Sequence, residues 1–127
     1  MSKMKDASNG LADRAANSLN GLRAVWKGEW AFRADLVVFA LAAVIACVIP
    51  GLAWSERALM IHSAFMPLLA ELANTAIETT VDRISLERHP LSGLAKDIGS
   101  ALVVASFVGA GICWFVILLG WGLRTFG

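Results

Sequence analysis

The feature that most constrains this chain is an apolar segment that ends in a stripe of polar side chains. Residues 58–70 are mostly apolar and are typical of the start of a membrane-spanning helix. Glu71, Asn74, Glu78 and Asp82 follow without a turn signal. Because each residue of an α-helix advances about 100° around the axis, these four side chains fall within a sector of about 80°. A carboxylate at membrane depth is costly unless it faces protein, water or a cation, so the stripe predicts a charged site on one helix face.

Composition favours a membrane protein. The chain has 127 residues, of which 57% are hydrophobic and only 17% are charged. A soluble domain of this size could not bury so much apolar surface. The net charge of +1 gives no general basic field, so no nucleic-acid partner is expected.

The apolar segments predict an all-α membrane protein with a single domain over residues 1–127. Three transmembrane helices are expected at 36–54, 58–81 and 98–123. The first of these, at about 1.5 Å per residue, is just long enough for the hydrocarbon core. Residues 1–35 have apolar side chains at helical spacing among polar ones, which predicts an amphipathic helix lying on the membrane surface. Its turn into the membrane is expected within residues 29–35.

The basic residues predict the orientation in the membrane. Three spans place the N-terminal segment and the second connection, Ile84–Asp97, on the same side. Nine of the eleven lysines and arginines lie on that side, and only Arg57 and Arg124 lie on the other. The positive-inside rule therefore predicts a cytoplasmic N-terminus. Within the connection, Ser92 is the expected N-cap of the third helix.

Several charges are expected to meet at the inner membrane boundary. Glu29 reaches it from the surface helix, and Lys96 and Asp97 reach it from the start of the third span. Two carboxylates such as Glu29 and Glu78 could hold Mg²⁺ that also binds phosphate oxygens. The deeper carboxylate, Glu71, is the expected acceptor of a proton from a lipid hydroxyl.

Nucleotide-binding motifs of the common classes are missing from the sequence. It contains no GxxxxGK[ST], no GxGxxG and no DFG. If the chain is a phosphotransferase, it therefore belongs to none of those classes.

Five stretches together resemble the integral-membrane bacterial diacylglycerol kinases. They are Gly21-Leu22-Arg23-Ala24, Glu29-x-Ala31-Phe32-Arg33, Glu71-Leu72-x-Asn74-x-Ala76-Ile77-Glu78, Val81-Asp82-Arg83 and Leu91-Ser92-Gly93-x-Ala95-Lys96-Asp97-x-Gly99-Ser100-Ala101. The resemblance covers roughly residues 20–123, in the family's order. It implies a homotrimer in the bacterial inner membrane, multi-pass, that transfers the γ-phosphate of MgATP to diacylglycerol and yields phosphatidate.

The resemblance also implies a role for each matching residue. Glu71 would be the general base, and Glu29 and Glu78 would hold the Mg²⁺ that accompanies the nucleotide. The implied ATP-binding residues are Asn17, Glu29, Asn74, Glu78, Glu87, Arg88, His89, Lys96 and Asp97. The implied lipid-substrate residues are Arg23, Trp26, Ala31, Phe32, Arg33, Ala34, Asp35, Glu71 and Ser100.

The chain departs from the family pattern at a few positions. Asn17 and Leu19 stand where relatives have aromatic residues, Ala34 replaces a polar residue, and Pro90 interrupts the second connection. These departures leave open the nucleotide contacts of the surface helix and the finer lipid contacts.

Two other functions remain open at this point. An undecaprenol kinase would use the same carboxylates on a long isoprenoid alcohol. A small cation-binding or transport protein would use the stripe to line an ion path. Against the second function, the charges cluster at the inner boundary, and the outer half of the second span offers only His62.

Overall fold

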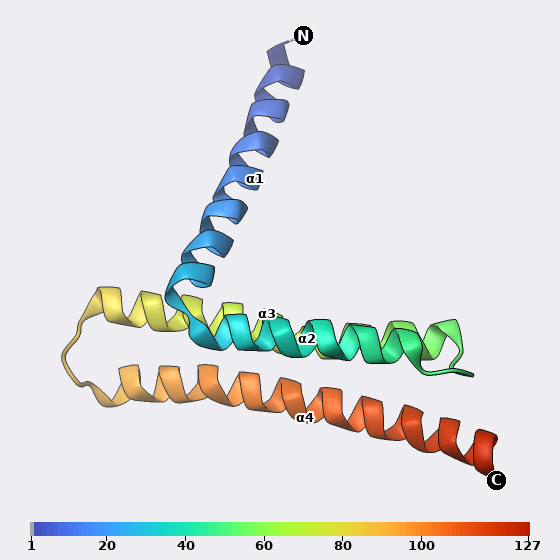
Figure 1. The fold of residues 1–127 in the computed structure, drawn as a ribbon. Coiled ribbons are helices and arrows are strands. Elements are labelled where there is room, and N and C mark those ends of the chain that lie inside the picture. The colour runs from blue at the N-terminus through green and yellow to red at the C-terminus, as the bar shows by residue number, and fades with distance from the viewer. Residues whose placement is uncertain (1) are drawn as a thin grey trace.

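The computed structural model describes residues 2–127, with side chains from Gly10 onward, and this part of the chain contains helices but no strand. The helices are α1 (Ser2–Gly28), α2 (Trp30–Val48), α3 (Trp54–Ile84) and α4 (Pro90–Phe126). Helices α2, α3 and α4 lie side by side in an elongated bundle, and α1 leaves the bundle at a steep angle (Figure 1).

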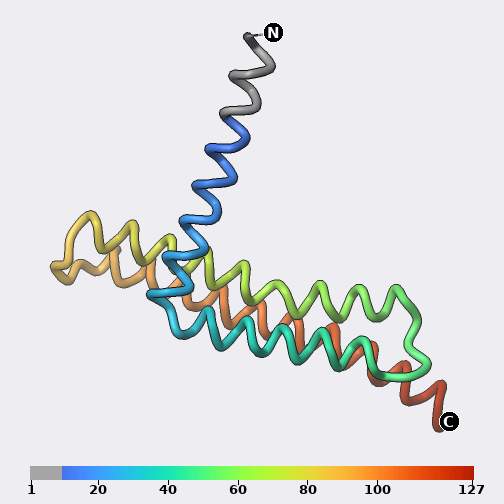
Figure 2. The backbone as a smooth tube through the Cα atoms, turned by 45° about the horizontal axis from the view of Figure 1, so that its top comes forward, coloured from blue at the N-terminus to red at the C-terminus, as the bar shows by residue number. Residues whose placement is uncertain are grey.

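Helix α3 is the central element of the bundle. It packs against both α2 and α4, whereas α2 and α4 make little contact with each other. The three helices alternate in direction, so α3 is antiparallel to both of its neighbours (Figure 2). The side chains that α3 presents to both neighbours therefore decide what lies inside the bundle.

Two helices, α2 and α4, are long and apolar enough to cross a membrane on their own. The helices of the described residues and these two candidate spans confirm the prediction of an all-α membrane protein. The predicted segment 36–54 runs past the end of α2. Ile49 is extended, as expected before Pro50, and Gly51 has a φ of +77°, so the helix ends at Val48.

The predicted surface segment, residues 1–35, is divided by a break at Glu29. This residue is extended, with φ −108° and ψ 110°, and α2 begins directly after it. The N–H group of Glu29 donates to the carbonyl of Val25 at 2.8 Å and closes the last turn of α1. Residues 30–35 therefore belong to the bundle helix α2, and the Glu29 side chain lies where the chain changes direction.

The expectation that Ser92 caps the last helix is wrong. The N-cap of α4 is His89, whose Nδ1 accepts a hydrogen bond from the N–H of Leu91 at 3.2 Å. Pro90 occupies the first helical position, where its missing N–H has no consequence. The connection from α3 is therefore only residues 85–89, and Lys96 lies inside the helix.

At the end of the bundle far from Glu29, Arg57 caps the C-terminus of α2. Its guanidinium donates to the carbonyl oxygens of Ala46 at 2.6 Å, of Cys47 at 2.5 Å and of Ile49 at 2.7 Å. The last carbonyls of a helix have no partner within the helix, so this single side chain satisfies groups that would otherwise need water. The cap ties the end of α2 to the start of α3.

A second set of contacts ties α4 to the same end. Glu56 accepts from the N–H of Ala53 at 2.9 Å and pairs with Arg124 at 2.7 Å. The Ala53 N–H group and the Arg124 guanidinium hold the pKa of Glu56 below its usual value. The indole Nε1 of Trp121 donates to the carbonyl of Pro50 at 2.8 Å. All three bundle helices are thus joined at the end opposite Glu29.

Candidate active site

The polar stripe of α3 is buried in the bundle at its Glu71 end and exposed at its Asp82 end. Glu71 and Asn74 are buried, with only 7% and 8% of their surface exposed. Glu78 is half-buried, and Asp82, one turn further, is exposed. The helical spacing therefore predicted the shared face correctly, and the structure adds a gradient of burial along it.

Three other carboxylates lie near enough to Glu71 for their charges to act on it: Asp35 on α2, Glu78 on α3 and Glu29 at the break between α1 and α2. Two of them, Glu29 and Glu78, are among the charges that the sequence placed at this boundary. The fourth carboxylate, Asp35, had only a lipid contact implied for it. Like charges in one place repel, so this group favours the approach of a cation or a proton.

The Asn74 amide joins the stripe to α4. Its Nδ2 donates to Glu78 Oε1 at 3.2 Å. Its Oδ1 is buried and has no hydrogen-bond partner among the residues that the structure describes. That oxygen lies against Gly99, where an added Cβ would overlap it. In the sequence, Gly99 stands out only as part of a motif. Its contact with Asn74 could not be predicted, because that contact depends on how α3 and α4 are aligned.

The oxygen donors of this group suit a hard cation. Within residues 10–127, no group of three or more His, Cys, Asp or Glu side chains is close enough to hold a metal by itself. Mg²⁺ bound together with a nucleotide needs only one or two protein carboxylates, because phosphates and water fill the other positions. Glu29 and Glu78, with the unpartnered oxygen of Asn74 nearby, fit that requirement.

A polar pocket of about 500 Å³ lies under the connection between α3 and α4. Four of the residues implied in ATP binding line it: Glu87, Arg88, His89 and Lys96. Lys96 Nζ also donates to Asp82 Oδ1 at 2.6 Å, across the two helices. The sequence predicted that Asp82 belongs to the stripe but gave no partner for it. The structure shows that Asp82, one turn beyond Glu78, lies beside the start of α4.

The residues implied in lipid binding are only partly brought together. Arg23, Trp26 and Phe32 line a pocket of about 350 Å³ where α1 meets α2. Arg33 donates to the carbonyl of Trp26 at 2.7 Å, so it fixes the bend between α1 and α2. Three further residues implied in lipid binding line neither this pocket nor the polar one: Ala31, Ala34 and Ser100. The same holds for Asn17 and Asp97, which are implied in ATP binding.

Another opening lies between α1 and α3. It has a volume of about 760 Å³, and Glu29 lies on its wall with Leu22, Thr75 and Thr79. The hydroxyl of Thr79 donates to the carbonyl of Thr75, so it is already satisfied within the helix. Glu29 therefore connects an opening beside the surface helix with the carboxylates around Glu71.

Comparisons with known proteins agree on one family. The family model described as "Prokaryotic diacylglycerol kinase" matches residues 16–118. A diacylglycerol kinase of Escherichia coli strain K12 is 46% identical over 104 residues, which are 82% of this chain and 84% of that protein. One of Pseudomonas aeruginosa is 46% identical over 103 residues, covering 81% and 83%. One of Haemophilus influenzae is 42% identical over 114 residues, covering 85% and 91%.

Proposed function

The chain belongs to the prokaryotic diacylglycerol kinase family, and from this we propose how its residues divide the work of the reaction. It is an ATP-dependent lipid kinase that phosphorylates the hydroxyl of diacylglycerol. The observation that carries the assignment of roles is the buried Glu71, which lies within electrostatic reach of Asp35, Glu78 and Glu29.

Glu71 is the general base. Its depth in α3 suits a hydroxyl that remains at the membrane boundary, and it is more buried than the other carboxylates of the group. The glycerol oxygen attacks the γ-phosphorus as its O–H proton passes to the Glu71 carboxylate. The bond from the γ-phosphorus to the bridging oxygen breaks, which gives phosphatidate and ADP. A positioned base of this kind contributes typically a factor of about 10²–10⁴ to the rate.

Glu29 and Glu78 would hold the Mg²⁺ that accompanies ATP. That ion would supply positive charge to offset the charge that develops on the phosphate oxygens. Asn74 keeps Glu78 in place through the hydrogen bond from its Nδ2.

The polar pocket under the α3–α4 connection receives part of the nucleotide. Arg88, His89 and Lys96 supply cationic or donor groups on its wall, and Glu87 lies beside them. Lys96 suits a phosphate oxygen, since its ammonium group is a compact charge on a flexible chain. The family resemblance adds Asn17, Asn74 and Asp97 to the nucleotide side of the site.

The lipid reaches Glu71 from the side of the surface helix. Arg23, Trp26 and Phe32 form one pocket there, and Arg33 fixes the bend that shapes it. The resemblance adds four more positions to the lipid side: Ala31, Ala34, Asp35 and Ser100. Of these, Asp35 lies near enough to Glu71 for its charge to act on that carboxylate, which supports placing it beside the reacting hydroxyl.

The chain crosses the bacterial inner membrane three times and works as a homotrimer. Helix α3 is the second span, with its charged half at the cytoplasmic boundary beside the N-terminal helix. The face of α3 opposite Glu71 carries the exposed His62, which suits another protein surface better than lipid. A second copy against this face would shield it, and further copies would enclose the charged stripe.

Transfer of labelled γ-phosphate tests the substrate and the assembly together. The full chain in detergent–lipid micelles is given MgATP with dioleoylglycerol or, separately, undecaprenol. We expect labelled phosphatidate with the first lipid and much slower transfer to the second, and chemical cross-linking of the same sample to stop at the trimer. Faster transfer to undecaprenol would reassign the acceptor, and cross-linking that stops at the dimer would refute the trimer.

A further inference from the structure

An apolar groove runs along the outer half of the same α3 face that carries the polar stripe. It has a volume of about 380 Å³ and is lined by side chains of α2, α3 and α4. On α3 its floor is Ala64 and Pro67, which lie seven and four residues before Glu71. At about 100° per residue, both lie within about 40° of Glu71 around the helix axis. One continuous stripe of α3 is therefore apolar in its outer part and carboxylate-bearing in its inner part.

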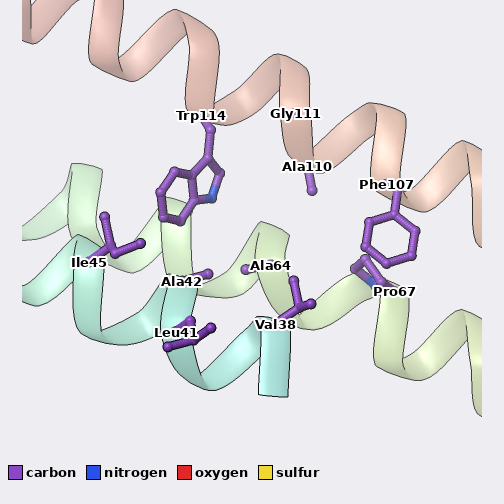
Figure 3. Close-up of a pocket in the computed structure, with 10 residues that line it drawn as sticks. All are labelled: Val38, Leu41, Ala42, Ile45, Ala64, Pro67, Phe107, Ala110, Gly111 and Trp114. Atoms are coloured by element: carbon purple, nitrogen blue, oxygen red, sulfur yellow. The ribbon is translucent and has the colours of Figure 1, made fainter. Parts of the chain in front are cut away.

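The groove exists because of how the three helices pack. Helices α2 and α4 both contact α3 but barely contact each other, so a gap is left between them above α3. Small residues widen the gap: Ala42 on α2, with Ala110 and Gly111 on α4. Figure 3 shows Phe107 and Pro67 together at one end, Trp114 at the other, and Ala110 and Gly111 between them on α4.

The dimensions of the groove select among possible occupants. Seven residues separate Phe107 from Trp114, which is about 10 Å of helix rise. An α-helix with its side chains is about 10–12 Å thick, so it could only lie across the mouth of the groove, whereas a hydrocarbon chain is thin enough to lie inside it. A cavity of about 150 Å³ already accepts benzene, so 380 Å³ suits a piece of hydrocarbon chain.

The outer end of the groove is rigid. The Trp114 indole Nε1 donates to the carbonyl of Met60 at 3.0 Å, and this ring packs against a buried cluster that contains Met60 and Ala46. The inner end, at Pro67, lies only about 6 Å of helix rise from Glu71. A molecule with a polar head at Glu71 and an apolar tail would therefore extend from the carboxylates directly into the groove.

We propose that this groove holds the first part of one acyl chain of the diacylglycerol whose hydroxyl is at Glu71. The inference rests on the proposed function and extends it from the reacting hydroxyl to the tail. The groove selects substrates with long chains, because only these reach beyond Pro67 and fill it. The fixed indole of Trp114 sets the depth to which the straight portion of the chain can enter.

Replacing a glycine in the groove wall tests the proposal. An added Cβ at Gly111 meets nothing within 4 Å, so Gly111→Leu puts a side chain into the groove without a clash at its root. Gly109→Leu is the matched control, because Gly109 is on the same helix, is exposed, has equally open space and does not line the groove. Ala42→Leu fills the groove from the α2 wall and serves as a second variant if Gly111→Leu does not fold.

The measurement is KM for dioleoylglycerol and for dibutyrylglycerol in micelles of the full chain with saturating MgATP. We expect Gly111→Leu to raise KM for the long-chain substrate about tenfold, the scale on which a pocket discriminates by volume. KM for the short-chain substrate and for ATP should stay unchanged, and Gly109→Leu should match the unmodified chain.

Two results would overturn the proposal. Equal KM values for the two glycine variants with dioleoylglycerol would show that no acyl chain enters the groove. Dissociation of the oligomer by Gly111→Leu, with Gly109→Leu intact, would show that a second copy of the chain covers it. Failure of the unmodified chain to phosphorylate either diacylglycerol would instead refute the proposed function, so the two failures can be told apart.

Discussion

Replacing Gly99 by alanine tests the contact that joins the polar stripe to α4. An added Cβ would overlap the Oδ1 atom of Asn74 and lie 3.3 Å from its Cγ, but it would lie an ordinary 3.6 Å from its Cα. The helices can therefore keep their spacing, and the amide head has to rotate away. The rotation breaks the 3.2 Å hydrogen bond from Asn74 to Glu78.

The effect on stability follows from two opposing contributions. A lost hydrogen bond to a charged acceptor lowers the free energy of unfolding by about 1.5–3 kcal/mol. Alanine in place of glycine inside a helix raises it by about 1 kcal/mol. The net loss for Gly99→Ala is therefore about 0.5–2 kcal/mol. Gly109→Ala, where the added Cβ meets nothing, should be neutral or stabilising.

Activity should respond more than stability, because Asn74 keeps in place the carboxylate of Glu78, which is proposed to hold the metal. We expect Gly99→Ala to raise KM for MgATP and to lower kcat, while Gly109→Ala changes neither. Unfolding by titration with a denaturing detergent in mixed micelles gives the stability, at one fixed protein concentration for all variants. The reasoning is refuted if Gly99→Ala keeps the kinetics of the unmodified chain, or if it destabilises by far more than one hydrogen bond.

Three further predictions concern the other polar contacts. Arg57→Met removes the cap on α2 and should lower the free energy of unfolding by about 3 kcal/mol in the same titration, with Arg57→Lys restoring only part. The backbone N–H of Ala53 and the guanidinium of Arg124 lower the pKa of Glu56 below its usual 4.5. The ionised Glu56 therefore contributes fully to stability above pH 4.5, and this contribution is lost as the pH falls below that value. Glu56→Gln should flatten this part of a stability–pH profile. Lys96→Met should raise KM for ATP about tenfold. Asp82→Asn should change the free energy of unfolding by less than about 1 kcal/mol, because the Lys96–Asp82 pair is partly exposed. The effect of Asp82→Asn on KM for ATP then reports how far Asp82 positions the lysine.

The sequence predicted the parts of the site that follow from helical spacing. Glu71 and Glu78 share a face because the 3.6-residue repeat requires it, and the structure adds that Glu71 is the more buried of the two. The sequence placed the turn into the membrane within residues 29–35, and the structure narrows it to the break at Glu29. The partner of Gly99 could not be predicted, since it depends on the relative height of α3 and α4. That height is set partly by the start of α4 at Pro90, two residues before the predicted cap.

Beyond a single helix, the sequence predicted which charges meet at the inner boundary but not which side chains contact one another. Spacing alone gives no reason for Asp35 of α2 to act on Glu71, and the structure provides one. The pairing of Lys96 with Asp82 likewise joins residues that are fourteen positions apart on different helices. Contacts of this kind arise from the turn between the helices, whose length the sequence left uncertain by several residues.

The most direct test of the account is the rate of phosphoryl transfer to dioleoylglycerol by Glu71→Gln. Glu56→Gln is the control, because it makes the same chemical change on the same helix at the far end of the bundle. The account predicts a loss of about 10²–10⁴-fold for Glu71→Gln at neutral pH, with KM for ATP little changed, and near-normal transfer for Glu56→Gln. A folded, oligomeric Glu71→Gln that transfers phosphate at the rate of the unmodified chain would contradict the assignment of Glu71 as the base.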